Sequence, residues 1–323
     1  MTGSNPSAMV IGGTAGVGRA VVDALLDRGY RVGVVARGAE RLREMEAAFG
    51  QDRVLGLQAD AGLADEIEEA ADTLVSAFDP PVVWVNSAVV NSYSPFEQME
   101  VEEFDAIIRT TFLGQVNGTR AALRVMRRGQ VVSIGSAQAY RALPYQSAHS
   151  AAKHAILGFN SAVRAELIRV GHPVSIAQVH LPPTNTPQFE WARNRLDRMP
   201  RPVPPIHQPE VAAQAVLKCI DGEHRELWVG RGVITLILGN AVLPSWLDRR
   251  LAEDGIDPQK SDLPEPRNRP DNLMHPLPRP SAARGQFAAE ADDKAAIVDG
   301  DLLRKLVFLG GPLAAFLLGL LLG

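Results

Sequence analysis

The feature that most constrains the fold is an alternation of two kinds of segment between residues 9 and 229. Short apolar runs of three to six residues are followed by longer stretches in which apolar side chains recur at helical spacing. Strands of a parallel sheet, buried on both faces, read as such short apolar runs. The alternation therefore predicts an α/β domain whose parallel sheet is covered by helices on both faces. The expected strands are 9–11, 31–36, 54–57, 82–85, 131–134, 174–179 and 227–229, and the main expected helices are 17–29, 63–77, 101–126 and 146–168.

The alternation fades after residue 255. Residues 258–280 contain seven prolines and many charges, and residues 281–300 are mostly small and polar or acidic. Such compositions are typical of linkers. The sequence therefore predicts one folded domain over 1–255, a flexible linker over 256–300 and a separate tail over 301–323.

The tail is apolar. Eighteen consecutive residues, 306–323, carry no charge, and Arg304 and Lys305 precede them. A helix of this length would span about 27 Å, close to the ~30 Å of a bilayer's hydrocarbon core. We expect membrane contact through 306–323, with the domain on the cytoplasmic side because basic residues flank the tail on that side. The alternative is a terminal helix packed on the domain or on a partner.

Composition excludes several functions. The chain has 33 basic and 37 acidic residues and a net charge of −4, which gives no electrostatic case for nucleic-acid binding. Its single cysteine, Cys219, can form neither an internal disulfide nor a cysteine metal cluster. The histidines have no metal-ligand spacing, so no metal is expected.

A glycine-rich turn separates the first expected strand from the first expected helix. Gly12, Gly16 and Gly18 lie in the segment IGGTAGVGRA. Glycines at such a turn let the backbone bend tightly and approach a pyrophosphate, whose charge is stabilised at the helix N-terminus. The turn predicts nucleotide binding, and a tight packing turn is the alternative.

The spacing Gly-x-x-x-Gly-x-Gly resembles that of the short-chain dehydrogenase/reductase family. Further motifs in the family's order extend the resemblance over residues 7–240: LGLQAD ending at Asp60, NSAV beginning at Asn86, and PPTNT ending at Thr186. The resemblance implies a Rossmann-type doubly wound parallel sheet. It also implies that Asp60 contacts adenine, that Asn86 belongs to the cofactor site, and that Thr186 contacts the nicotinamide amide.

The end of the second expected strand bears on cofactor choice. Enzymes that use NAD usually place a carboxylate there to bind the ribose hydroxyls. This chain has Ala36 followed by Arg37. Without a carboxylate, a 2′-phosphate meets no like charge, and Arg37 could pair with it. NADP(H) is therefore favoured over NAD(H), and a solvated surface arginine is the alternative reading of Arg37.

The resemblance also implies a catalytic set, of which this chain keeps two members. Ser136 matches the serine that holds the substrate oxygen, and Lys153 matches the lysine that binds the ribose. The family tyrosine, which acts as general acid/base, is replaced by His149. The family asparagine, which holds a relay water, is replaced by Thr111.

His149 and Lys153 are four residues apart and would share one helix face. A neighbouring ammonium lowers the pKa of an imidazole, but histidine can still act as a general acid/base. We expect an oxidoreductase that moves a hydride between nicotinamide and a carbonyl or alcohol substrate. Two alternatives stay open: Tyr145 or Tyr140 supplies the proton, or the chain is a dinucleotide-binding regulatory or scaffold protein without turnover.

Residues 187–210 occupy the place of the family's substrate lid. Phe189, Trp191, Leu196 and Met199 offer apolar contacts there, which favours a lipophilic ketone or alcohol. The expected helices 101–126 and 146–168 resemble those that pair between subunits in the family. The resemblance therefore implies a homodimer or homotetramer.

Overall fold

The computed structural model describes residues 5–310 and residue 320, and a single central sheet organises them. Its strand order is β14-β11-β7-β6-β4-β1-β2-β3. Seven of these strands run parallel, and β14 pairs with β11 in the antiparallel sense at one edge. The strands are β1 (Ser7–Ile11), β2 (Arg31–Ala36), β3 (Val54–Gln58), β4 (Val83–Asn86), β6 (Gly129–Ser136), β7 (Val174–Leu181), β11 (Glu226–Val229) and β14 (Ile297–Asp299).

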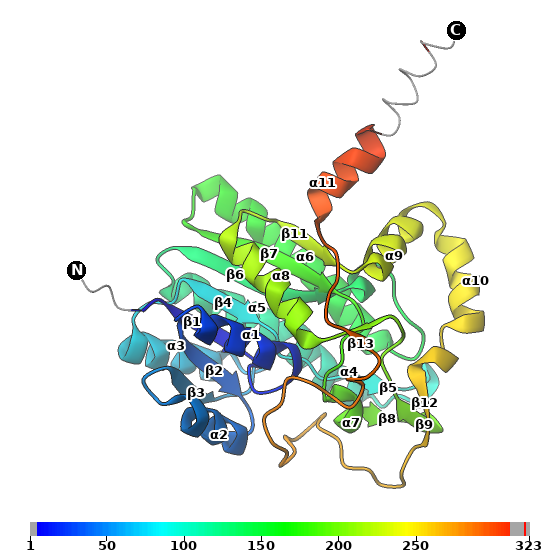
Figure 1. The fold of residues 1–323 in the computed structure, drawn as a ribbon, viewed down its shortest axis with the longest axis horizontal. Helices are drawn as coiled ribbons and strands as arrows, with labels where there is room; N and C mark the ends of the chain where they lie inside the picture. Colours follow the sequence, from blue (N-terminus) through cyan, green and yellow to red (C-terminus); the bar gives the residue numbers. More distant parts are fainter. Residues whose placement is uncertain (1–4, 311–319, 321–323) are drawn as a thin grey trace.

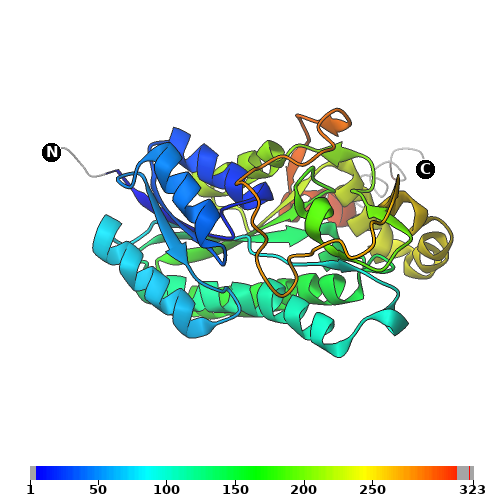
Figure 2. The ribbon, with the colours of Figure 1, turned by 90° about the horizontal axis from the view of Figure 1, so that it is seen from below.

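Helices cover both faces of this sheet (Figures 1 and 2). In β1, Ala8 and Val10 pack in the apolar core on one face of the sheet, whereas Met9 and Ile11 pack in the core on the other face. This alternation is the one that a sheet buried on both faces requires, and it confirms the predicted doubly wound α/β fold. The main helices are α1 (Gly16–Asp27), α2 (Ala39–Phe49), α3 (Ala64–Phe78), α4 (Val101–Ile108), α5 (Gly114–Val125), α6 (Ser147–Val170) and α8 (Pro209–Asp221).

The helix expected over 101–126 is two helices. A π-helical turn, Arg109–Leu113, joins α4 to α5. Such turns widen the helix by one residue and change the direction of the side chains that follow. Thr111 lies at the centre of this turn.

Smaller elements lie beyond the carboxyl ends of the strands and close the domain there (Figure 1). Strand β5 (Ser92–Tyr93) pairs with β8 (Arg193–Asn194), and the short helix α7 (Gln188–Trp191) precedes β8. Two further helices, α9 (Arg231–Val242) and α10 (Pro244–Asp254), follow β11.

The structure differs from the prediction at residues 256–300, which were expected to be a flexible linker. Here they pack on the domain: β12 (Lys260–Pro264) pairs with β9 (Arg198–Pro200), β13 (Ala291–Asp292) pairs with β10 (Ile206–His207), and β14 completes the central sheet. Two apolar side chains explain the packing. Leu273 is 1% exposed and Phe287 is 7% exposed, each in an apolar cluster with residues far away in the sequence.

Residues 271–285 of this segment form a strap across the domain. In Figure 2 this orange segment crosses from the helices at one end of the molecule toward the blue helices at the other. Arginine side chains fix it along the way: Arg37 donates to the carbonyl oxygens of Asn272, Leu273 and Met274. At its far end, Ala282 accepts from the N–H of Gly16.

The start of the predicted tail is a helix, α11 (Gly300–Lys305), followed by a π-helical turn, Leu306–Gly310. Within residues 5–310 and 320, no helix combines the length and the apolar character needed to cross a membrane. Most of the tail, 311–319 and 321–323, lies outside the described residues. Membrane contact through 306–323 therefore stays a prediction.

Candidate active site

A cavity of about 530 Å³ lies at the carboxyl ends of the parallel strands. Its walls include residues at or just after the ends of β1, β2, β3, β4, β6 and β7. In doubly wound sheets, ligands bind at this edge, where neighbouring strands send their helices to opposite faces. Here β1 leads into α1 on one face, and β4 leads toward α4 on the other, so the cavity lies at such a switch point.

The glycine-rich turn has the tight geometry that the sequence predicted. Gly12 and Gly16 have positive φ angles of 82° and 57°. A Cβ on Gly18 would lie 2.1 Å from the carbonyl oxygen of Gly12, so no side chain fits there. Helix α1 begins at this turn without a side-chain cap. First-turn N–H groups without a cap can bind an anion such as a pyrophosphate.

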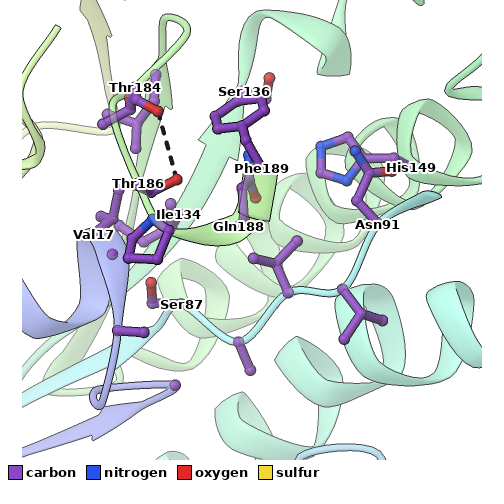
Figure 3. A pocket seen from close by; sticks show the side chains of 18 of the residues that line it. Val17, Ser87, Asn91, Ile134, Ser136, His149, Thr184, Thr186, Gln188 and Phe189 are labelled. Carbon is purple, nitrogen blue, oxygen red and sulfur yellow. Dashed lines mark hydrogen bonds between the residues drawn. The ribbon is translucent and has the colours of Figure 1, made fainter. Parts of the chain in front are cut away.

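Thr186 lies directly against this turn. A Cβ on Gly16 would lie 3.1 Å from the Thr186 Cβ atom, and both residues line the cavity. The Thr186 hydroxyl lies 3.5 Å from the carbonyl oxygen of Thr184 (Figure 3). Residues more than 160 positions apart in the chain are thereby brought to one wall of the cavity.

Asp60 and Arg37 line the cavity near β2 and β3. The Asp60 carboxylate accepts from the N–H of Gly62 at 2.8 Å, which fixes its orientation. The Arg37 guanidinium is turned toward the strap, where it donates to three backbone carbonyl oxygens. It is therefore not the solvated surface arginine that the sequence left open.

Asn86 does not line the cavity. Its side chain accepts from Trp84 Nε1 at 3.0 Å and donates to Thr119 Oγ1 at 3.1 Å, and it is 1% exposed. The bond to Thr119 joins β4 to α5. The residues that follow it, from Ser87 to Asn91, line the cavity instead.

Ser136 ends β6 and lines the cavity. Its Oγ accepts from the N–H of Gln138 at 3.1 Å and so caps a short 3-10 turn, Ala137–Ala139. Figure 3 labels it together with His149, which lines the same cavity. A hydroxyl held this way keeps its proton free for a substrate oxygen.

Lys153 and His149 face the cavity from α6. The Lys153 ammonium donates to the carbonyl oxygen of Ile134 at 2.8 Å, and burial lowers the pKa of Lys153 to about 8. Burial and, to a lesser extent, the Lys153 charge lower the pKa of His149 to about 3. The imidazole is therefore neutral at pH 7, and its Nδ1 has no hydrogen-bond partner within the described part of the chain.

Thr111 does not reach the cavity. Its hydroxyl donates to the carbonyl oxygen of Val90 at 3.1 Å and accepts from the Val90 N–H at 3.3 Å. The side chain is fully buried. Its neighbour Thr110 lines the cavity in its place.

The two tyrosines that the sequence offered as substitutes also lie outside the cavity lining. Tyr140 donates to Glu226, and burial raises its pKa. Tyr145 packs beside an apolar cluster and is not a lining residue. A tyrosine that the sequence analysis missed, Tyr93, does line the cavity, and burial raises its pKa.

A polar wall of three amide side chains was also missed. Gln146 Oε1 accepts from Asn91 Nδ2 and from Gln138 Nε2, each at 3.0 Å, and all three residues line the cavity. Isolated amide residues in three separate loops or turns leave no periodic signal in a sequence. Only the fold brings them beside His149.

The rest of the cavity wall is largely apolar. Phe189 and Trp191 come from α7, as the predicted lid implied. Three further apolar side chains come from helices that the sequence analysis had not connected with the site: Val233, Leu236 and Leu251. Among residues 5–310 and 320, no group of three or more His, Cys, Asp or Glu side chains could hold a metal ion.

Sequence comparisons agree with this architecture. The family model for short chain dehydrogenases matches residues 6–196. An uncharacterized oxidoreductase of Bacillus subtilis (strain 168) is 28% identical over 264 residues, which cover 79% of this chain and 74% of that protein. A 3-oxoacyl-(acyl-carrier-protein) reductase of Bos taurus is 30% identical over 163 residues, covering 50% of this chain and 68% of that protein.

Solved structures also resemble this one. A short chain dehydrogenase from Burkholderia cenocepacia J2315, crystallised in complex with NADP, superposes with a TM-score of 0.64 at 26% identity. The match covers 77% of this chain and 98% of that chain. A short-chain dehydrogenase from Streptomyces avermitilis shares the fold with a TM-score of 0.66 at 23% identity, covering 78% of this chain and 100% of that chain.

Proposed function

This chain belongs to the short-chain dehydrogenase family of NAD(P)-dependent oxidoreductases, and from that premise we propose that it interconverts a carbonyl and an alcohol with NADP(H) and the set Ser136, His149 and Lys153. The observation that carries the proposal is their arrangement around one cavity, together with the glycine-rich turn and Thr186. When bound, the nicotinamide supplies or accepts the hydride.

The residues around the cavity fit a dinucleotide. The first turn of α1 has no side-chain cap, and although the Gly16 N–H donates to Ala282, its remaining N–H groups can bind the pyrophosphate. Asp60 lies where the adenosine would be held. Lys153, already donating to a backbone carbonyl oxygen, has two further N–H groups for the ribose hydroxyls. Thr186 would hold the nicotinamide amide beside the same turn.

His149 and Ser136 would handle the substrate oxygen. The Ser136 hydroxyl donates to that oxygen and so orients it. Because His149 is neutral at pH 7, it can accept a proton from an alcohol, whereas for carbonyl reduction it must first take one from solvent. A pKa of about 3 makes it a weak base, which favours slow turnover compared with a tyrosine at the same position.

The preference for NADP(H) rests on Arg37. No carboxylate follows Ala36, and Arg37 lines the cavity although it now donates to the strap. A 2′-phosphate would replace those carbonyl oxygens with a charged acceptor. We expect Arg37→Gln to weaken NADPH binding about ten- to a hundredfold and to leave NADH binding unchanged. The control variant is Arg43→Gln, on the exposed side of α2, which should change neither.

The apolar wall favours a lipophilic substrate. Phe189, Val233 and Leu251 would pack against its apolar part, while the amide wall around Gln146 would accept a single polar group. Two relatives carry names that imply such substrates: the 3-oxoacyl-(acyl-carrier-protein) reductase, and an 11-beta-hydroxysteroid dehydrogenase of Arabidopsis thaliana, 31% identical over 49% of this chain and 47% of that protein.

The test combines binding and turnover. NADPH and NADH binding would be measured by calorimetry, and a panel of aliphatic, steroid and short polar ketones would then be assayed with the natural chain and with His149→Tyr. Turnover by the natural chain supports a working His149. The competing proposal is a dinucleotide-binding regulatory or scaffold protein without turnover. The lowered pKa of His149 and the buried position of Thr111 favour it. Turnover only by His149→Tyr would support this competing proposal. Failure to bind either dinucleotide would exclude both.

A homodimer or homotetramer is part of the proposal. The outer side of α6 exposes small side chains, including Ala151, Gly158 and Ala162, which allow two helices to approach closely. Light scattering would measure the assembly. Ala162→Arg is expected to dissociate it without altering the cavity, and an unchanged mass would exclude this face of α6 as the interface.

A further inference from the structure

A buried polar cluster lies next to Ser136 but outside the cavity lining. His180 of β7 has its Nδ1 atom 3.0 Å from the carbonyl oxygen of Ser136. Because a carbonyl oxygen only accepts, Nδ1 carries the proton and donates it to Ser136. The other ring nitrogen, Nε2, lies 3.4 Å from Glu226 Oε1, and neither side chain is more than 2% exposed. Burial lowers the pKa of His180 to about 4, so the ring is neutral at pH 7 and its Nε2 has no hydrogen-bond partner among the described residues.

Glu226 is surrounded by donors from four residues. Its carboxylate accepts from the Tyr140 hydroxyl and the Trp228 indole N–H, and from Arg225 at 3.1 Å. Arg304 donates to both of its oxygens, at 3.0 and 3.1 Å. A buried carboxylate needs such partners, because an unpaired charge in the interior is strongly unfavourable.

Arg304 reaches this cluster from the C-terminal helix α11. Its guanidinium lies over the Trp228 ring, 4.7 Å from the ring centre, and donates to the Tyr140 hydroxyl at 2.8 Å. Asp301, one turn earlier, pairs with it at 3.1 Å. Helix α11 is thereby connected through Glu226 and Tyr140 to the loop that follows β6.

His180 is held firmly between these groups. The Tyr140 ring packs edge-on against it at 5.0 Å between ring centres, and a Cβ on Gly135 would lie only 2.9 Å from its Nδ1. The ring therefore has little room to turn, and its bond fixes the peptide plane after Ser136. Glu226 and Arg304 hold the Tyr140 hydroxyl, and the Tyr140 ring closes one side of His180. Displacing Tyr140 would therefore free the ring, and the end of β6 with it.

We propose that Arg304, Glu226 and His180 are positioning residues that hold the backbone of Ser136, so that α11 is part of the machinery that orients the substrate oxygen. The proposal rests on the role of Ser136 in the proposed function. It assigns a task to residues beyond 300, which the sequence alone places in a separate tail.

Two measurements on the full chain test it. The first is hydrogen exchange of the peptide covering 134–141 without substrate, and the second is kcat together with the NADPH Kd. The variants are Arg304→Gln, Arg304→Lys as conservative rescue, and Lys305→Gln as control, since Lys305 is exposed and adjacent. Because Arg304→Gln leaves Glu226 without its main counter-charge, Glu226→Gln/Arg304→Gln provides a charge-neutral version that should fold.

We expect faster exchange over 134–141 in Arg304→Gln and in the double variant, recovery in Arg304→Lys, and no change in Lys305→Gln. A displacement of about 1 Å at Ser136 is expected to lower kcat about ten- to a hundredfold with an unchanged NADPH Kd. Unchanged exchange, or changed exchange with unchanged kcat, would overturn the proposal. Where neither the natural chain nor His149→Tyr turns over any ketone, the proposed function fails by itself, and exchange over 134–141 still decides the coupling to α11.

Discussion

Replacing Lys153 by methionine is expected to stabilise the nucleotide-free protein at pH 7 while abolishing its response to NADPH. Burial lowers the pKa of this lysine from 10.5 to about 8, because the folded interior disfavours the ammonium. A shift of that size corresponds to about 3 kcal/mol of folding free energy. The lost hydrogen bond to Ile134 offsets about 1 kcal/mol, which leaves a net gain of about 2 kcal/mol.

The sign of the effect follows from proton binding. Between pH 8 and 10.5 the unfolded chain keeps the proton on Lys153, while the folded protein loses it, so folding becomes more favourable as the pH rises. Below pH 8 the full penalty applies to the natural chain. The methionine variant never carries that penalty, so it should be more stable at pH 7. Near pH 11 only the lost bond to Ile134 remains, and the variant should be less stable by about 1 kcal/mol.

Urea unfolding at pH 7 and pH 11, with and without NADPH, measures both effects. At a hundred times its Kd, NADPH should add about 2.7 kcal/mol to the natural chain and nothing to Lys153→Met. Lys218→Met is the matched control, because Lys218 also donates to a backbone carbonyl oxygen, at 3.0 Å, but is exposed. A Lys153→Met variant less stable than the natural chain at pH 7, or with the same advantage at pH 11, would refute the reasoning.

Three further predictions follow from the site and the tail. Folding lowers the pKa of His149 from 6.5 to about 3, so between these values the unfolded chain binds a proton that the folded protein does not. The free energy of unfolding should therefore drop by up to about 5 kcal/mol as the pH falls from 6.5 to 3. In urea titrations, His149→Gln should remove most of this pH dependence. Gly18→Ala, whose Cβ would meet the Gly12 oxygen, should weaken NADPH binding at least tenfold by calorimetry. Gly29→Ala lies beyond the opposite end of the same helix, where a Cβ meets no atom within 4 Å, and should leave NADPH binding unchanged. A chain ending at Lys305 should leave the membrane fraction that the full chain enters, and equal partition of the two would exclude anchorage through 306–323.

The fold was predictable because its signals are local. Apolar runs and helical spacing specify strands and helices from neighbouring residues, and a four-residue separation places His149 and Lys153 on one helix face. The glycine-rich turn is equally local, since tight backbone contact at Gly18 depends on residues only six positions away.

The failures concern directions and distant contacts. Asn86 lies two residues after Trp84 in β4, so the two side chains point to the same face of the sheet. Trp84 faces the core beneath α3 and α5, and the Asn86 side chain therefore points there as well. The π-helical turn redirects Thr111 toward Val90. Neither effect is visible in a motif, because each depends on the phase of a particular strand or helix.

Residues 256–300 were misread for a related reason. Their prolines and charges resemble those of a linker, and Leu273 and Phe287 are too few to form a periodic pattern. Besides these two side chains and the strand pairings, Arg37 and Arg41 hold the segment by donating to its carbonyl oxygens. The acceptors in these bonds are backbone carbonyl oxygens, which every residue has. The bonds therefore cannot be predicted from the composition of the segment.

The strap also gives the site an order of assembly. Every other wall of the cavity is complete once the ribosome has made residue 251, and the strap emerges only afterwards. Asn272 and Pro276 are therefore the last residues to join the cavity wall. Because a 2′-phosphate would take Arg37 away from three carbonyl oxygens of the strap, we expect NADPH to bind faster to a chain in which residues 271–285 are replaced by glycine and serine, as measured by stopped-flow fluorescence.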